Sequence, residues 1–271
     1  WNRLNTLLKP EQSCSPVSLT IDGIICVGKD LTDKFNDYFT SLVQSEHDPS
    51  TLDFVKNRAN DTMALIKCDC DEVSAAFRCM KISKCADAFG LTMIPVLHVL
   101  VVICPLLTHI YNLSFRTGTF PSEVKKAKVI ILHKGGAKEI LGNYRPISIL
   151  PIFSKGLERV IYVRISKFFE KYGLITSTQF GFRERSSTEV AQLKQKELIL
   201  HNIEKKLMIL GIFIDFSKAF DRINHKTLLL KLRAYGVRGV PLNLILSYLR
   251  DRTQYVAIDN HHSFCNKVEH G

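Results

Sequence analysis

The residues best suited to chemistry stand around two aspartates in the last quarter of the chain. Asp215 directly follows a continuous apolar run at 207–214, and Asp221 comes six residues later. A carboxylate at the exposed end of a rigid strand can hold a divalent cation, because hard cations prefer oxygen ligands. An aspartate after a strand is also a common helix cap or loop residue, so Asp215 has two interpretations when it is taken alone.

Basic side chains concentrate in the same half of the chain. Residues 1–124 contain 11 Lys and Arg against 14 Asp and Glu, whereas residues 125–271 contain 26 against 12. A globular chain with a net charge of +11 and a pI of about 9.3 suggests an anionic partner, such as nucleic acid, a nucleotide or a membrane surface. The uneven distribution assigns that partner to the C-terminal half.

The elements that would position these residues follow from hydrophobic periodicity. Helices are predicted at 31–43, 71–80 (with Asp71 as N-cap), 153–172, 187–206, 227–234 and 241–249. Strands are predicted at 128–133, 145–150, 207–214 and 255–258, and a loop at 48–50. The first two strands would form a hairpin with a long tip, and 207–214 reads as a strand buried on both faces. In the helix at 153–172, Leu157 and Val160 should face the core and Glu158 the solvent.

An uncharged stretch leaves two interpretations open. Residues 88–115 contain no Asp, Glu, Lys or Arg, and 93–111 is long enough to span a bilayer. Prolines and histidines interrupt the stretch, however, and Leu100, Val101 and Leu107 fit the one-sided spacing of a buried helix. We expect a packed helix and no membrane partner, with a membrane-attached basic protein as the alternative.

Composition places the chain among globular intracellular proteins. Its 271 residues, 46% hydrophobic and 23% charged, can bury the core of one large domain or two smaller ones, which excludes disordered and collagen-like classes. Eight cysteines without a C-x-x-C pair favour reduced thiols. The alternative is a zinc site formed by Cys68, Cys70, Cys79 and Cys85. The chain opens at Trp1 without a signal peptide, so we expect a piece of a longer protein of the cytoplasm or nucleus, not a secreted one.

Four segments resemble the reverse transcriptases of non-LTR (LINE-type) retrotransposons, in the order of that family. Residues 213–229 (FIDFSKAFDRINHKTLL) resemble the first catalytic motif, and 124–148 (VKKAKVIILHKGGAKEILGNYRPIS) resemble the fingers hairpin. Residues 179–183 (QFGFR) match a further motif, and 120–122, followed by a lysine-rich stretch, match the lead-in. Fainter similarity extends back to about residue 65.

The resemblance implies an α+β fold, the fingers and partial palm of a right-hand polymerase, truncated before the remaining palm motifs and the thumb. Residues 1–64 would be an N-terminal extension preceding the polymerase, 65–127 a helical lead-in to the fingers, and 128–271 the incomplete fingers and palm. The implied reaction of the full-length element is RNA-directed addition of dNTPs to a DNA primer 3′-OH on an RNA template. Its implied cofactor is Mg²⁺ or Mn²⁺, which would neutralise developing charge.

The resemblance also implies roles for residues around Asp215. Asp215 would be the catalytic metal ligand, assisted by the backbone carbonyl of Phe216. Phe220 would be a steric gate whose ring excludes a 2′-OH, with a core aromatic as its alternative interpretation. Asp221 would hold the turn into the next helix.

Further roles are implied on the hairpin and in the QFGFR segment. Lys134 and Arg145 would clamp the triphosphate, because Arg offers a bidentate fork and Lys a compact charge; their alternative is a solvated basic loop. Gln179, Gly181 and Arg183 would lie near the template or the nucleotide. Other lysines and arginines would add salt-sensitive attraction to phosphates.

The sequence also departs from the family pattern. Neither the Gly-x-Pro-Gln-Gly element nor the Tyr-Ala-Asp-Asp element occurs, so the aspartate pair that completes the metal site is missing. Phe89 stands where a Pro-Gly-x-Asp-Gly run usually has its acidic residue. We therefore expect this fragment alone to be inactive, and a catalytically dead, basic nucleic-acid-binding remnant is the alternative function.

Overall fold

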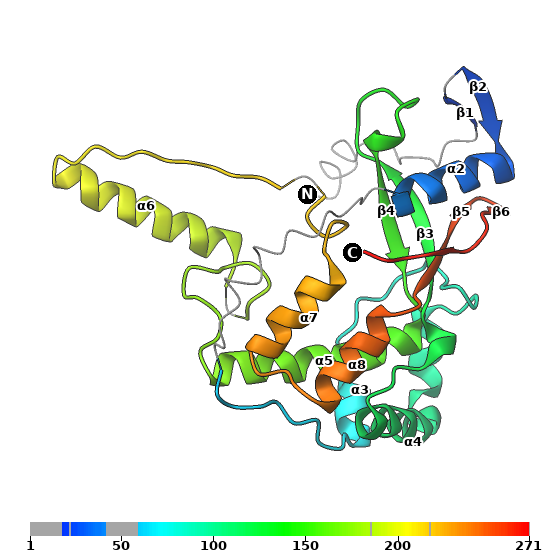
Figure 1. Ribbon diagram of the computed structural model, residues 1–271, viewed down its shortest axis with the longest axis horizontal. Coiled ribbons are helices and arrows are strands. Elements are labelled where there is room, and N and C mark those ends of the chain that lie inside the picture. Colours follow the sequence, from blue (N-terminus) through cyan, green and yellow to red (C-terminus); the bar gives the residue numbers. More distant parts are fainter. Residues whose placement is uncertain (1–17, 22, 42–58, 185, 217, 271) are drawn as a thin grey trace.

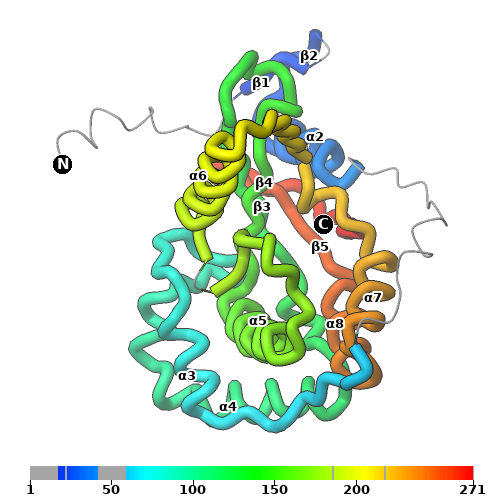
Figure 2. The backbone as a smooth tube through the Cα atoms, turned by 90° about the vertical axis from the view of Figure 1, so that its left-hand side faces the viewer, coloured from blue at the N-terminus to red at the C-terminus, as the bar shows by residue number. Residues whose placement is uncertain are grey.

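The computed structural model describes residues 18–21, 23–41, 59–184, 186–216 and 218–270 (Figure 1). A small sheet with an N-terminal helix lies at one end of the molecule, and a group of helices lies at the other (Figures 1 and 2). This mixed helix and sheet content agrees with the predicted α+β class.

The sheet is built around β3 (Lys126–His133), an eight-residue strand in which alternate side chains are buried. Successive side chains of a strand point to opposite faces, so one face of β3 meets the core. β3 pairs antiparallel with β4 (Tyr144–Ile149) and parallel with β5 (Thr253–Ile258). These pairings confirm the predicted hairpin and the predicted strand at 255–258.

Four further strands are short and were not predicted. β1 (Ser18–Ile21) and β2 (Ile24–Val27) form a separate antiparallel hairpin. β6 (His261–His262) and β7 (Asn266–Lys267) each pair antiparallel with β5. Strands of two to four residues carry too little alternation to be recognised from the sequence.

Helix α2 (Gly28–Ser41) packs against the sheet. Leu31 and Phe35 are fully buried and belong to the same hydrophobic cluster as side chains of β3, β4 and β5. Helix α2, which lies in the predicted N-terminal extension at 1–64, thus shares a core with the hairpin. The domain boundary after residue 64 stays a prediction. α2 confirms most of the helix predicted at 31–43; its last two residues and the loop at 48–50 lie outside the described residues.

A second core forms where four helices meet. These are α3 (Cys70–Arg78), α4 (Met93–Thr117), α5 (Ile152–Lys171) and α8 (Val240–Leu249). Its large, fully buried side chains include Phe77, Phe120, Leu157 and Leu244. α7 (His225–Ala234) packs on α8, and the short 3-10 helices η2 (Ser122–Val124) and η3 (Leu141–Asn143) lie at the two ends of β3 and β4. The helices predicted at 153–172, 227–234 and 241–249 are confirmed to within two residues.

The N-cap of α3 is Asp69, and the prediction of Asp71 was wrong. Asp69 has extended backbone angles, and its Oδ1 accepts a hydrogen bond from the Glu72 amide at 2.8 Å. Asp71 lies inside the first turn, where a negative charge still complements the helix dipole.

Helix α4 is a packed helix, and its buried face matches the predicted one except at Val101. It contacts α3, α5 and α8, and within the described residues it is the one helix long and apolar enough to cross a membrane, with 33% of its most apolar window buried. Val101, predicted to face the core, is 77% exposed, whereas Leu100 is buried. Consecutive helical residues lie about 100° apart, so the contact that buries Leu100 turns Val101 outward.

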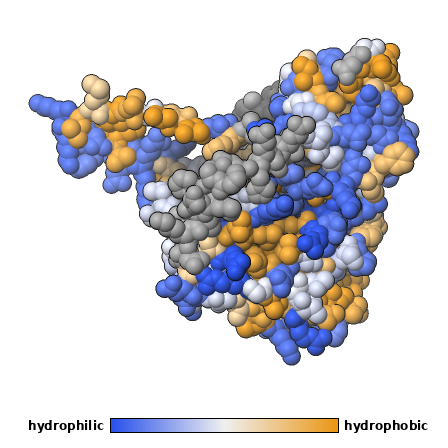
Figure 3. Space-filling model, in the orientation of Figure 1, coloured by the Kyte–Doolittle hydropathy of each residue, from blue (hydrophilic) through white to orange (hydrophobic). Residues whose placement is uncertain are grey.

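The predicted strand at 207–214 is not formed. Helix α6 (Thr188–Glu204) and the segment after it project from the body, and α6 has no buried residue (Figure 1). Met208, Leu210 and Phe213 are 100%, 85% and 84% exposed, and apolar surface marks this projecting arm (Figure 3). A strand requires a hydrogen-bonded neighbour, and residues 207–214 pair with none of the described strands; β3 pairs with β4 and β5 instead. Composition alone therefore misassigned this segment.

Candidate functional site

The tip of the β3–β4 hairpin is a closed, glycine-dependent loop. The Lys134 amide donates to the carbonyl of Asn143 at 2.9 Å, and the Asn143 side chain donates to the carbonyl of Ala137 at 2.8 Å. Gly135 and Gly136 have φ values of +109° and +86°, in the region that favours glycine. A Cβ on Gly136 would stand 2.7 Å from Asn143 Nδ2, so a larger residue would disrupt the loop.

The two predicted triphosphate-binding residues belong to this end of the hairpin. Lys134 follows the last residue of β3, and Arg145 pairs with Leu132 in the strand register. Both residues are exposed, and among the described residues neither side chain makes a hydrogen bond or ion pair. Their cationic groups are therefore accessible to an anionic ligand, while the predicted role stays a prediction.

Asp215 lies in an irregular segment between α6 and α7. Its side chain is exposed, and the neighbouring Phe216 is 76% exposed. Because no strand precedes it, the carboxylate does not sit at the end of a rigid element as predicted. The structure does not bring Lys134 or Arg145 into contact with it through any hydrogen bond or ion pair among the described residues.

The described residues do not by themselves form a metal centre. Among them, no group of three or more His, Cys, Asp or Glu side chains could hold a metal ion. Asp215 supplies one carboxylate of the hard type that Mg²⁺ prefers, and Phe216 one carbonyl, which is too few for a complete site. The zinc alternative fails by the same criterion, and six cysteines in the described part of the chain are free: Cys68, Cys70, Cys79, Cys85, Cys104 and Cys265.

The ring of Phe220 meets the ring of Phe182 from the QFGFR segment. Their centroids are 5.8 Å apart at an interplanar angle of 84°, the edge-to-face geometry that aromatic pairs prefer. Phe220 is 64% exposed, so it is not a core aromatic in this structure. Phe182 has a φ of +58°, which turns its ring outward toward Phe220 at the cost of backbone strain. The gate role of Phe220 stays a prediction.

Arg183 fastens the QFGFR loop to the end of α5. Its Nε and Nη2 donate to Glu170 Oε1 and Oε2 at 2.9 and 3.0 Å, and its Nη1 donates to the carbonyl of Thr176 at 3.1 Å. The hydrogen bond to Glu170 raises the pKa of Arg183. Gln179 donates to the carbonyl of Gly181 at 3.2 Å, within the same loop. These contacts are internal to the protein. The position of Gln179, Gly181 and Arg183 near the template or the nucleotide stays a prediction.

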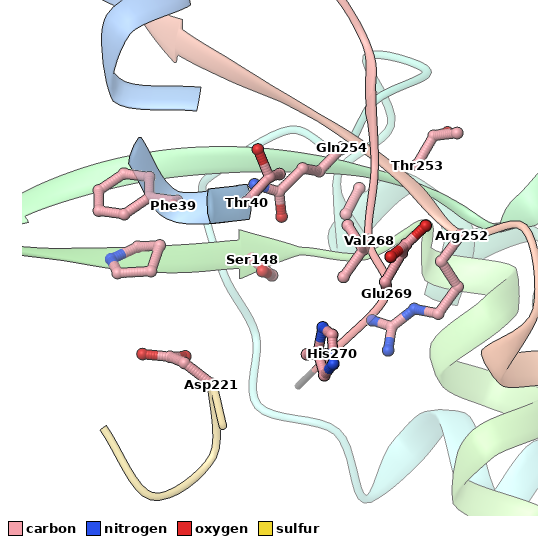
Figure 4. Close-up of a pocket in the computed structure, with 12 residues that line it drawn as sticks. Phe39, Thr40, Ser148, Asp221, Arg252, Thr253, Gln254, Val268, Glu269 and His270 are labelled. Atoms are coloured by element: carbon pink, nitrogen blue, oxygen red, sulfur yellow. The ribbon is translucent and has the colours of Figure 1, made fainter. Parts of the chain in front are cut away.

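A small cavity of about 110 Å³ lies between Asp221 and the C-terminal strands (Figure 4). Asp221 borders one side, and Arg252, Glu269 and His270 gather on the other. A larger cavity of about 540 Å³ shares these last three residues and adds Lys226, Arg250 and Lys267. Cations outnumber carboxylates in the larger cavity, a balance that suits a phosphate-bearing ligand.

A buried carboxyl supports the arginine that lines both cavities. Glu158 was predicted to face solvent, but its carboxyl accepts hydrogen bonds from Ser154 Oγ at 2.7 Å and from the Tyr248 hydroxyl. Burial raises the pKa of Glu158, and burial together with the nearby Glu158 charge raises the pKa of Tyr248 to about 12. The Arg252 guanidinium carbon lies 5.1 Å from the Tyr248 ring centroid. The prediction was wrong because α8 covers this face of α5.

Asp87 is a structurally central residue that sequence reasoning missed. It is 3% exposed and accepts three backbone hydrogen bonds, from Phe89 and Leu91 at 2.9 and 3.0 Å on Oδ1 and from Ile152 at 2.9 Å on Oδ2. These bonds join the loop after α3 to the first residue of α5, next to the end of β4. The available signal was an aspartate shortly before Gly90, a pattern typical of side-chain-capped turns.

Comparison with known proteins identifies the relatives of the chain. Residues 125–269, more than half of the chain, match the family model for reverse transcriptase (RNA-dependent DNA polymerase). Over 161 residues the chain is 34% identical to the probable RNA-directed DNA polymerase from transposon BS of Drosophila melanogaster, which covers 57% of this chain and 17% of that protein. Over 166 residues it is 33% identical to the RNA-directed DNA polymerase from mobile element jockey of the same fly, covering 60% and 18%.

A longer alignment reaches a third relative. Over 268 residues the chain is 26% identical to the retrovirus-related Pol polyprotein from type-1 retrotransposable element R1 of Bradysia coprophila, covering 94% of this chain and 25% of that protein. The chain therefore spans a quarter or less of the length of these curated relatives.

Proposed function

Because the chain belongs to the reverse transcriptase (RNA-dependent DNA polymerase) family, we propose that it forms part of the RNA-directed DNA polymerase of a retrotransposon. The proposed reaction is RNA-templated addition of deoxynucleotides to the 3′-OH of a DNA primer. One observation carries the proposal: the matched region, 125–269, contains both the basic hairpin tip and the segment that carries Asp215. The relatives, which come from a transposon, a mobile element and a type-1 retrotransposable element, support the same activity.

We propose that the fold is the fingers and part of the palm of a right-hand polymerase. The β3–β4 hairpin would belong to the fingers, and β5 with the Asp215 segment to the palm. The apolar run at 207–214 supports this division, because its exposed side chains, among them Met208, Leu210 and Phe213, would be covered in a larger palm.

The nucleotide would meet the chain from two sides. Lys134 and Arg145 would bind its phosphates, since both are exposed cations at one end of the hairpin and an arginine fork matches phosphate geometry. Phe220 would face the sugar, held in place by the edge of Phe182. The family generally uses divalent metal ions, and Asp215 would be one ligand for Mg²⁺ or Mn²⁺ in the complete enzyme.

The template and primer would meet the basic half of the chain. Residues 125–271 carry 26 Lys and Arg against 12 Asp and Glu, and attraction of this kind is independent of base sequence. Gln179, Gly181 and Arg183 would hold the loop that approaches the template. We propose an intracellular location, in the cytoplasm or nucleus, which fits the free cysteines of the described residues.

A second candidate function is a nucleic-acid-binding remnant without catalysis. The observation that favours it is that, among the described residues, no group of three or more His, Cys, Asp or Glu side chains could hold a metal ion. Both candidates bind RNA and DNA through the same basic surface. Only primer extension separates them.

The experiment is primer extension on poly(rA)/oligo(dT) by the polypeptide that the complete reading frame encodes. Wild-type protein should extend the primer, and Asp215→Asn should lower kcat by about 10²-fold or more, as for loss of one strong electrostatic stabiliser. Asp71→Asn is the matched control, because it removes one exposed carboxylate far from the site. Equal activity of wild type and Asp215→Asn would refute the catalytic assignment. Wild-type protein that binds primer-template without extending it would favour the remnant.

A further inference from the structure

A tyrosine outside the family-matched region reaches the candidate site. Tyr38 lies on α2, whereas the match begins at residue 125. The Tyr38 hydroxyl accepts a hydrogen bond from Lys218 Nζ at 3.1 Å, and the same Nζ lies 4.9 Å from the Tyr38 ring centroid. Lys218 stands between Asp215 and Phe220 in the sequence. The upstream helix thus holds the segment proposed to carry the chemistry.

The same hydroxyl also touches the hairpin tip. A Cβ built on Gly142 would stand 3.1 Å from the Tyr38 hydroxyl oxygen, so tip and tyrosine are in close approach. Gly142 belongs to η3, and the next residue, Asn143, accepts the hydrogen bond from the Lys134 amide. Tyr38 therefore lies beside both the tip that bears Lys134 and the turn that begins at Lys218.

Helix α2 is held firmly enough to position both the hairpin tip and the turn that begins at Lys218. The Asn36 side chain, in a residue 1% exposed, donates to the carbonyl of Phe264 at 2.8 Å and accepts from Gln254 Nε2 at 3.1 Å. Asp33 accepts from the Phe264 amide at 2.8 Å. Together with the buried Phe35, these contacts fix α2 to the sheet and to the chain after β6. A group that binds a side chain of α2 is therefore held in a fixed position relative to the sheet.

Lys218, which donates the hydrogen bond to Tyr38, has a strained backbone that needs such support. Lys218 has a φ of +54°, a conformation that a non-glycine residue adopts at an energetic cost. Its carbonyl accepts the Arg222 amide at 3.2 Å, and the carbonyl of Phe220 accepts the Ile223 amide at 3.3 Å. The turn that carries Phe220 is thus built on a strained residue, and the bond to Tyr38 is the long-range hydrogen bond that holds its side chain.

We propose that Tyr38 is a positioning residue that holds the turn at 218–223, and through it Phe220, against the hairpin tip. Its relevance to nucleotide binding rests on the proposed polymerase function. Tyr38 contacts no substrate in this role and acts through Lys218. The family-matched region would then depend on an upstream helix for the relative position of its two nucleotide-facing parts.

Hydrogen exchange of the 271-residue chain tests this link without substrate, so failure of the polymerase activity would not affect the result. Tyr38→Phe keeps the ring and removes the hydroxyl, and Lys218→Met removes the cation. Each should speed exchange of the Arg222 and Ile223 amides roughly two- to tenfold, the effect of one ordinary hydrogen bond, while the melting temperature stays unchanged. Exchange at the tip, residues 134–143, should rise in Tyr38→Phe.

Three further variants sharpen the test. The double variant should exchange no faster than the single ones, because both remove the same interaction. Lys218→Arg, which keeps a donor and a charge, should exchange like wild type. Tyr162→Phe is the matched control, an exposed tyrosine on α5 with Arg159 over its ring at 5.1 Å, and should leave the turn unchanged. Unchanged exchange at Arg222 and Ile223 in Tyr38→Phe would overturn the proposal, and so would faster exchange across the whole chain with a lowered melting temperature.

Discussion

Replacement of Asp87 by alanine should be among the most destabilising single changes in the chain. The side chain is 3% exposed and accepts backbone hydrogen bonds from Phe89, Leu91 and Ile152. The bond to Ile152 is fully buried, and this amide opens α5, where a negative charge also complements the helix dipole. Alanine would leave these donors unsatisfied.

The expected magnitude follows from these three bonds. A buried donor left without a partner costs about 1–3 kcal/mol, and the two part-buried donors can recover some of their loss by bonding to water. The free energy of unfolding should therefore fall by about 3–5 kcal/mol. Asp87→Asn should cost less, since one side-chain oxygen remains for the amides of Phe89 and Leu91 while its NH₂ group faces the Ile152 amide.

Urea unfolding followed by far-UV circular dichroism measures both variants. The matched control is Asp69→Ala, because Asp69 also accepts a backbone hydrogen bond but is an exposed N-cap. Loss of such a cap costs about 1 kcal/mol. If Asp87→Ala destabilises the protein no more than Asp69→Ala, the account of Asp87 as the anchor between the loop and α5 is wrong.

Three other expectations concern charge and discrimination. Because burial raises the pKa of Glu158, its ionisation should lower the stability of the fold as pH rises above the ordinary pKa of 4.5. Glu158→Gln should therefore reduce the fall of the melting temperature with rising pH and give a higher melting temperature at neutral pH. Binding of single-stranded RNA by the chain should weaken by about 10³-fold or more from about 50 to 200 mM salt if six or more phosphates are contacted, and a flat titration by fluorescence anisotropy would contradict this. In the complete polypeptide, Phe220→Val should raise rNTP use relative to dNTP use by roughly 10–200-fold, and an unchanged ratio with a lowered melting temperature would remove the gate assignment.

Local patterns in the sequence were enough to predict the parts of the fold that depend on neighbouring residues. The hairpin of β3 and β4 follows from two β-branched runs around Gly135 and Gly136, and α5 follows from its helical spacing. The predicted strand at 207–214 failed because a strand also requires a partner, which composition does not supply. The prediction that Val101 faces the core was wrong for a related reason. Helix α4 is apolar on most of its surface, so the helices packed against it decide which face is buried.

The candidate site also contains residues that the sequence predicts and contacts that it does not. Lys134, Arg145 and Asp215 could be chosen from residue type and motif, and the hairpin does present the first two as exposed cations. The contact of Tyr38 with Lys218 spans 180 residues, and such a pairing leaves no periodic signal in either segment. Arg183 was predicted near the template, but its ion pair with Glu170 depends on a loop geometry that the sequence does not reveal.

Residues that precede the matched region hold the β3–β4 hairpin at both of its ends. At its foot, Asp87 fixes the start of α5 directly after β4. At its tip, α2 places Tyr38 beside Gly142, and one face of the hairpin shares a core with α2. Both anchors precede residue 125, where the family match begins. A hairpin fixed at two separate points can present exposed cations at its tip without bending away, so the proposed binding of phosphate there would need little rearrangement.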